Sequence, residues 1–278
     1  MHSLIKIGRL FYGGGIISYG IQQIVIRDFR RQILPGFPSW AHEYSVFPII
    51  TGGLMILSGV VIMGLFHFKN ITLKRVCIYL GCYFLFLILV SHIPYLLFVY
   101  PHKLSHLGSW GDLLYELAFA GGAFVIAASD TERVSLSDTK SIYLRIHEKY
   151  SLWGRIFYCT TIILFGFNHF AYDISGMVPK WMGIPEFWSY FGGAALLASG
   201  VAIMFKFHTR FIAMLLAIML FLWFILIHIP SVVAAAYPTN GNQIVSAFDA
   251  LLFCGIALVL GFTKENDGLI NKNIYNLE

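Results

Sequence analysis

The chain has 278 residues, of which 58% are hydrophobic and only 12% are charged, and its mean hydropathy is +0.74. So little polar surface excludes a soluble globule and predicts a protein that lives in lipid. A net charge of +5 would also suit nucleic acid, but in a membrane protein an excess of basic residues reports topology, so we expect no nucleic-acid partner.

Eight apolar stretches are long enough to cross a hydrocarbon core of about 30 Å, which takes roughly 20 residues of helix. In chain order they are 5–26, 46–66, 76–99, 113–128, 152–171, 187–205, 211–236 and 244–262. The segments between them are short and rich in turn residues. The first stretch is too long, and too poorly matched to a cleavage site, for a removable signal peptide, so we expect it to be the first span.

The basic residues predict the orientation of these spans. Fourteen of the 19 Lys and Arg residues fall on the side that holds both termini. By the positive-inside rule this places both termini in the cytoplasm and the protein in the cell's inner membrane. One loop, with Arg27, Arg30 and Arg31, goes against the rule.

The chain also repeats itself, which is the most informative feature of the sequence. The stretch GRLFY at 8–12 matches GRIFY at 154–158, and His-Ile-Pro occurs at 92–94 and again at 228–230. Further along, Glu116 is matched with Asp249. Changes of offset fall between the matched blocks, where loops absorb small insertions.

The repeat predicts an all-α integral membrane protein with eight transmembrane helices. They would form two tandem four-helix bundles, 1–130 and 151–264, joined by a cytoplasmic linker at 131–150 and followed by a cytoplasmic tail at 265–278. Within the linker, 142–150 is predicted as a short interfacial helix. Because each unit has an even number of spans, both have the same orientation, and the expected symmetry is a pseudo-two-fold axis along the membrane normal.

Polar residues inside the spans come in matched pairs. Each is costly in lipid, about 2.5–3.5 kcal/mol for a charge at a helix centre, so such residues face the bundle interior and often mark function. The pairs are Arg9 with Arg155, Gln23 with His169, His92 with His228, and Glu116 with Asp249. At a rise of about 1.5 Å per residue, all but the arginines fall in one layer near the outer surface.

A carboxylate beside an imidazole suits proton transfer. We therefore predict that His92 with Glu116, and His228 with Asp249, form catalytic clusters, with Gln23 and His169 as substrate-binding neighbours. Two other interpretations stay open. In the first, the cluster holds the helices together where proline leaves carbonyl groups without a donor. In the second, the two histidines hold a metal or haem, and only their symmetric positions support this. We expect no metal.

Arginine and tryptophan complete the candidate substrate-binding residues. Arg9 and Arg155 lie near the starts of their spans, where a guanidinium can reach the headgroups or tether helices instead. Trp40 and Trp181 each follow a proline by two residues in the outer loops. They could anchor the protein at the interface or act as a lid over the polar cluster.

The sequence lacks the motifs of thiol redox chemistry and of several known enzyme classes. The four cysteines, Cys77, Cys82, Cys159 and Cys254, form no Cys-x-x-Cys pair, so we expect packing roles rather than a disulfide relay. Dinucleotide, Walker, nucleophile-elbow and zinc-protease motifs are missing as well.

On these motifs each unit resembles the DoxX-like family of small four-helix membrane proteins. The second unit carries the likeness most clearly, with Arg155, a Gly-x-x-His-Phe ending at Phe170, and the His-Ile-Pro at His228. The first unit departs from it by having Gln23 in place of His169. The resemblance implies membrane redox partners, including a quinone-linked thiosulfate oxidoreductase, while many members have no settled activity.

Two classes of function follow. The first is a redox-linked membrane subunit that handles a quinone or a sulfur compound and its protons at the outer His and acid pairs. The second is a protein without enzymatic activity, either a carrier of a small solute or lipid, or an assembly or structural subunit of a larger membrane complex. The predicted outer loops are short, so they offer little surface for binding a large soluble partner.

Overall fold

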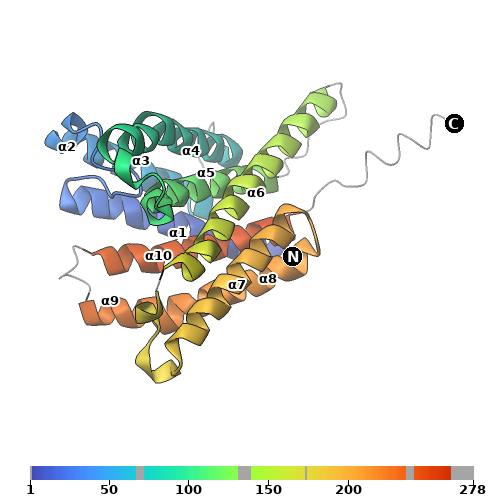
Figure 1. Ribbon diagram of the computed structural model, residues 1–278. Coiled ribbons are helices and arrows are strands. Elements are labelled where there is room, and N and C mark those ends of the chain that lie inside the picture. Colours follow the sequence, from blue (N-terminus) through green and yellow to red (C-terminus); the bar gives the residue numbers. More distant parts are fainter. Residues whose placement is uncertain (1, 67–71, 131–138, 173, 236–240, 264–278) are drawn as a thin grey trace.

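The computed structural model describes all residues except 1, 67–71, 131–138, 173, 236–240 and 264–278. The predicted tail at 265–278 and the first part of the predicted linker therefore lie outside the described residues. Every regular element in the described part is a helix (Figure 1). Six of these helices are long and apolar enough to cross a membrane, so the chain is a polytopic membrane protein by length and composition.

The eight principal helices match the eight predicted stretches. They are α1 (His2–Ile26), α3 (Val46–Met63), α4 (Leu73–Leu87), α5 (Gly111–Ser129), α6 (Thr139–Ala171), α7 (Pro185–Met204), α8 (Thr209–Trp223) and α10 (Asn242–Phe262). Short helices α2 (Trp40–Glu43) and α9 (Ile229–Ala235) accompany them. The six apolar candidates do not include α1 and α6, whose arginine, glutamine or linker residues lower their hydropathy.

Helix ends follow from local sequence. Gly64 ends α3 in the left-handed region, at φ 76°, where its N–H reaches the carbonyls of Val60 and Val61. The Thr72 hydroxyl begins α4 by accepting the N–H of Arg75. The start of α6 at Thr139 changes one expectation, because the helix predicted at 142–150 is continuous with the following span.

Two helices change pitch just before a proline. The helix α4 continues as the π-helix η1 (Ile88–His92) before Pro94, and α8 continues as the π-helix η7 (Phe224–His228) before Pro230. Proline has no N–H to donate and its ring crowds the preceding turn, so the helix widens there. Each histidine of the His-Ile-Pro motifs therefore ends a π-helical turn.

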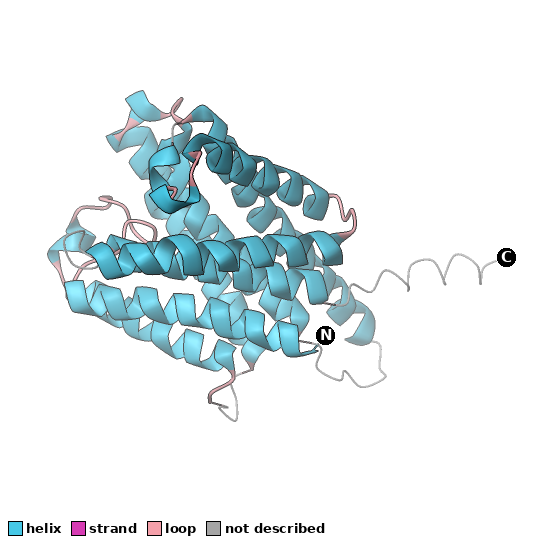
Figure 2. Ribbon diagram, turned by 90° about the horizontal axis from the view of Figure 1, so that it is seen from below, coloured by secondary structure: helices cyan, strands magenta, loops and turns pink. Residues whose placement is uncertain are grey.

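The helices form a closed ring in which each packs on the next in the order α1, α3, α4, α5, α6, α7, α8, α10 and back to α1. In addition, α5 and α10 contact each other across the ring, and they are the two apolar candidates whose residues are mostly buried. Figure 2 shows the bundle from a second direction, with loops gathered at both ends of the helices.

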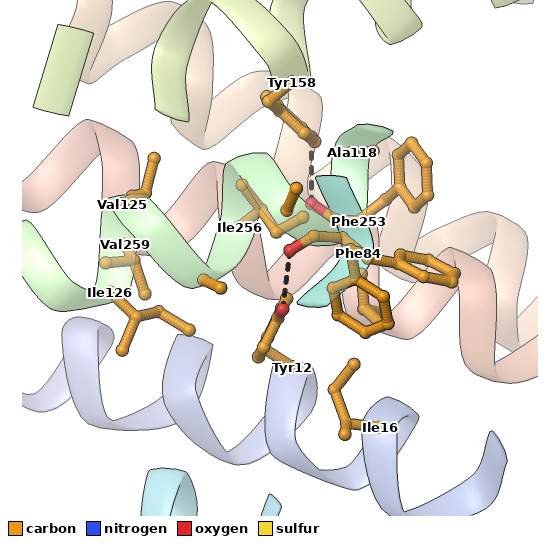
Figure 3. Close-up of a cluster of buried hydrophobic side chains, with 14 of the residues drawn as sticks. Tyr12, Ile16, Phe84, Ala118, Val125, Ile126, Tyr158, Phe253, Ile256 and Val259 are labelled. Atoms are coloured by element: carbon orange, nitrogen blue, oxygen red, sulfur yellow. Dashed lines mark hydrogen bonds between the residues drawn. The ribbon is translucent and has the colours of Figure 1, made fainter. Parts of the chain in front are cut away.

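Two tyrosines form hydrogen bonds from neighbouring helices to the central helices α5 and α10. Tyr12 on α1 donates its hydroxyl to the carbonyl of Phe119 on α5, at 2.6 Å, and Tyr158 on α6 donates to the carbonyl of Phe253 on α10, at 2.9 Å (Figure 3). Both tyrosines are fully buried among apolar side chains. In such surroundings an unpaired hydroxyl or carbonyl is costly, so these bonds fix the heights of the helices.

Glycines allow close approach at two crossings. A Cβ on Gly8 of α1 would lie 2.6 Å from the carbonyl oxygen of Gly255 on α10, and one on Gly154 of α6 would lie 2.7 Å from that of Gly121 on α5. Backbones can come this near only where both residues lack side chains.

We call the end of the bundle where α1 starts and α10 ends the terminal end, and the opposite end the loop end.

Candidate functional site

His92 and Glu116 come together at the loop end of the first half. His92 ends the π-helix η1, and Glu116 lies in the second turn of α5. The Nε2 atom of His92 is 2.9 Å from the Oε2 atom of Glu116, and the two side chains are 3% and 0% exposed. The predicted proximity of this pair is therefore found.

This contact is a close approach rather than an aligned hydrogen bond. Neither carboxyl oxygen of Glu116, nor Nε2 of His92, has a hydrogen-bonding partner of acceptable geometry among the described residues. The imidazole and the carboxyl are thus close neighbours without a hydrogen bond of good geometry between them. A buried carboxyl that lacks a full set of donors is energetically costly, so its environment does not stabilise it well.

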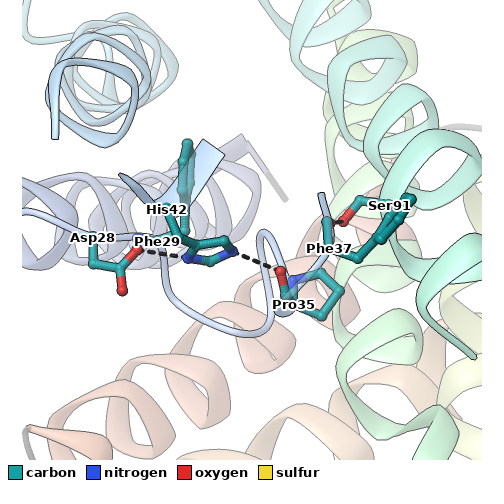
Figure 4. Close-up of polar contacts among 6 residues, drawn as sticks. All are labelled: Asp28, Phe29, Pro35, Phe37, His42 and Ser91. Carbon is teal, nitrogen blue, oxygen red and sulfur yellow. Dashed lines mark hydrogen bonds and ion pairs between the residues drawn. The ribbon is translucent and has the colours of Figure 1, made fainter. Parts of the chain in front are cut away.

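A loop covers the pair at the loop end. The Ser91 hydroxyl, next to His92, donates to the carbonyl of Phe37 (Figure 4). The ring of His42 is 2.7 Å from both a carboxylate oxygen of Asp28 and the carbonyl oxygen of Pro35. These contacts hold the segment between α1 and α2 against the π-helix η1, where the imidazole of His92 is buried.

Among the described residues no hydrogen bond joins the predicted neighbour Gln23 to the pair. Its side chain is fully buried on α1, and its amide nitrogen lies 3.6 Å from the sulfur of Met55 on α3. Its Oε1 atom has no hydrogen-bonding partner among the described residues. Gln23 is thus a second buried polar group of the first half that is only partly satisfied.

In the second half the predicted cluster of His228 with Asp249 stays a prediction. Among the described residues no hydrogen bond or ion pair joins His228 to Asp249. Asp249 instead accepts a hydrogen bond of 2.7 Å from the hydroxyl of Tyr19, which belongs to α1 in the first half. His169 bonds the carbonyl of Ser189 at 2.8 Å.

The tyrosine bonds support a different alignment of the two halves. If the acceptors Phe119 and Phe253 are taken as equivalent, Asp249 corresponds to Tyr115 and Ala250 corresponds to Glu116. The pairing of Glu116 with Asp249 differs from this alignment by one residue. One residue turns a side chain by about 100° around the helix, and Asp249 faces Tyr19 on α1.

Ring contacts agree with this alignment. The ring of Tyr115 on α5 packs against Phe165 on α6, with centroids 4.8 Å apart. Phe165 occupies on α6 the place that Tyr19 occupies on α1. One half therefore has an aromatic pair where the other has a tyrosine–carboxyl hydrogen bond.

The remaining candidates are the two arginines and the two tryptophans. Arg9 donates a hydrogen bond of 2.9 Å to the hydroxyl of Ser129, tying α1 to the end of α5 as in the tethering interpretation. Arg155 is buried on α6. Trp40 and Trp181 are 54% and 67% exposed, which suits anchors at an interface better than a lid on a buried site.

Three residues that the sequence reasoning missed line the same region. Tyr19 is the donor to Asp249. Tyr83 on α4 has a buried hydroxyl close to Glu116. Asp112 begins α5 one turn before Glu116 and pairs with Arg31 at 3.5 Å. The four-residue spacing of the two acids was a usable signal, because it puts them on one face of the helix.

Over its described residues, the chain is thus a polytopic, helical membrane protein with a buried imidazole–carboxyl pair in its first half and a buried tyrosine–carboxyl bond between its halves. Comparisons of the chain with models of known protein families, with curated proteins and with solved structures find no match.

Proposed function

We propose that the chain is a tandem duplication of one DoxX-like four-helix unit. In this arrangement α1 and α6 span the membrane together with the six apolar helices, giving eight spans related by a pseudo-two-fold axis along the membrane normal. The order of helices around the ring supports this, because exchanging the halves maps each neighbouring pair onto another. The paired tyrosine bonds and glycine crossings support it as well. Both termini then lie on the cytoplasmic side of an inner membrane.

We further propose a redox-linked membrane subunit in which Glu116 and His92 bind and release a proton during reaction of a quinone or a sulfur compound. The observation that carries this proposal is the Glu116 carboxyl, which is fully buried, 2.9 Å from an imidazole and without an aligned donor. An acid that served only to pin helices would be expected to have its donors in place, as Asp249 has.

The role of each group follows from its chemistry. A buried carboxyl can hold a proton as the neutral acid, and the adjacent imidazole can accept or return it. Reduction of a quinone to a quinol takes up two electrons and two protons, so a proton donor that is shielded from water suits it. The π-helical turn that ends at His92 supports the assignment, since such turns are frequent at functional sites.

A second candidate is a carrier without redox chemistry. It is favoured by the matching π-helical turns before Pro94 and Pro230, because interrupted helices in both halves of a duplicated membrane protein are typical of transporter sites. Under this interpretation the same carboxyl would exchange a proton for a solute. An assembly or structural role needs neither carboxyl.

One experiment separates these functions. The protein, gently solubilised with its lipids, is analysed by mass spectrometry for bound ubiquinone and menaquinone, and infrared difference spectra are recorded as the quinone is reduced. We expect bound quinone and a carboxyl band that changes on reduction, lost in Glu116→Gln and kept in the matched control Asp249→Asn. The quinone form of the proposal fails if no quinone is bound, and the role of Glu116 fails if the band survives in Glu116→Gln. A solute-dependent band without quinone would indicate the carrier.

A further inference from the structure

A groove of about 770 Å³ opens at the terminal end of the bundle, far along the helices from Glu116. Its walls come from the start of α1, the start of α8 and the end of α10. Three helices that the proposed topology places across the membrane therefore end around one hollow, at the height where the lipid headgroups would lie.

The lining has two chemistries. Lys206, His208 and Arg210 contribute basic side chains to the lining, and Leu4, Met214 and Leu260 contribute apolar ones. None of the described residues that line the groove is acidic. The groove thus offers positive charge beside a surface suited to hydrocarbon, and both exist together in a phospholipid with an anionic headgroup.

The basic residues are held at the groove by the turn between α7 and α8. Lys206 and His208 both lie in the left-handed region, at φ 61° and 44°, which is uncommon for residues with side chains. The guanidinium of Arg210 lies over the ring of Phe262, 5.1 Å from its centre. Because a cation over an aromatic ring is stabilised, Phe262 positions this charge at the mouth of the groove.

We propose that this groove binds an anionic phospholipid, with the phosphate between Lys206 and Arg210 and an acyl chain along the apolar residues. The site is separate from the proposed redox chemistry and does not depend on it. A free phosphate ion shares the headgroup's chemistry, but it would leave the apolar residues of the groove unused. The start of α8, which has no side-chain cap, adds a positive helix end to the same place.

Native mass spectrometry of the full chain in detergent tests the proposal. Dioleoylphosphatidylglycerol and the zwitterionic dioleoylphosphatidylcholine are added in parallel, and inorganic phosphate is added as a third arm. We expect selective retention of the phosphatidylglycerol, weakened roughly tenfold to 30-fold in Lys206→Gly/Arg210→Gln. Glycine accepts the left-handed backbone at 206, so the variant should fold.

A matched control removes the same charge at the loop end. Lys103→Gln/Lys180→Gln should retain phosphatidylglycerol as the wild type does. Equal retention of the two lipids by the wild type would overturn the proposal, as would an equal loss in both double variants. Displacement of the lipid by millimolar inorganic phosphate would show a phosphate site and overturn the lipid assignment. Melting temperatures of both variants close to wild type establish that they are folded.

Discussion

The two buried carboxyls of the fourth helices differ in what surrounds them. Asp249 on α10 accepts the hydroxyl of Tyr19 and so links the two halves of the chain. Glu116 on α5 lies against His92 within the first half, without an aligned donor. The same kind of group is thus satisfied at one place and poorly satisfied at the other, and the proposed chemical role of Glu116 is based on this difference.

The contacts around these acids are nevertheless matched. Each fourth helix crosses the first helix of the other half at a glycine pair, and each receives a tyrosine hydroxyl on a backbone carbonyl. The difference between Asp249 and Glu116 is therefore a local one, set within a shared framework. Mutations can test the framework and the two acids separately.

The largest effect is expected where the framework itself is broken. Gly8→Ala would push a methyl group against the carbonyl of Gly255, and Gly154→Ala would do the same against Gly121. Each should lower the free energy of unfolding by about 2–3 kcal/mol, because backbone cannot yield as a side chain can. Thermal unfolding in detergent, followed by circular dichroism, measures both.

Gly14→Ala is the control for this pair. It lies in the same helix as Gly8, and a Cβ there meets nothing within 4 Å. Alanine should raise stability by about 0.5–1 kcal/mol through helix propensity. Similar losses at Gly8 and Gly154 would support matched crossings. A loss at one alone would show that the halves do not share this contact.

The next effect concerns the link between the halves. Asp249→Ala leaves the buried hydroxyl of Tyr19 without its acceptor and should cost about 1–3 kcal/mol. Asp249→Asn keeps an acceptor and should cost less than about 1 kcal/mol. Denaturant unfolding of both variants in the same detergent measures the difference.

Tyr19→Phe combined with Asp249→Ala makes the control. If the two groups act as a pair, the double variant should lose less stability than the sum of the single variants. Additive losses would mean that the hydrogen bond does not stabilise the protein. The activity of Asp249→Asn tests separately whether Asp249 takes part in chemistry. A purely structural acid should tolerate asparagine without loss of activity.

The same residues show which features of the fold and the candidate site the sequence could predict. Span lengths and helix rise predicted the eight helical stretches and brought His92 to the depth of Glu116, because depth depends only on counting residues. The same count put Asp249 at the depth of His228, and that pairing stays a prediction. Counting residues cannot give the rotation of α10 about its axis, so it did not predict that Asp249 accepts the hydroxyl of Tyr19.

The sequence could not predict how the two halves pack against each other either. The repeat predicted two four-helix bundles but not their contacts with each other, in which α1 packs on α10 and α6 on α5. Hydrophobic periodicity says little about which helix lies next to which when nearly every face is apolar. Gly8 and Gly154 belonged to the matched stretches, but a glycine reveals close approach without naming its partner.

The smallest change in stability, and the most informative, is expected at Glu116. Glu116→Gln keeps the size of the side chain while removing its charge and its ability to release a proton. We expect the free energy of unfolding to change by less than about 1 kcal/mol, because no aligned donor is lost. Activity should be abolished, measured as the quinone-linked infrared band described above.

Glu116→Leu separates this expectation from helix pinning. Replacing a poorly satisfied buried carboxyl by an apolar group of similar size is often neutral or stabilising, by about 1–4 kcal/mol. A carboxyl that pins α5 to His92 would instead leave the imidazole unpaired when removed, at a cost of about 1–3 kcal/mol. The sign of the stability change in Glu116→Leu therefore decides between the roles. Destabilisation of that size, together with full activity of Glu116→Gln, would make both carboxyls structural and remove the contrast with Asp249.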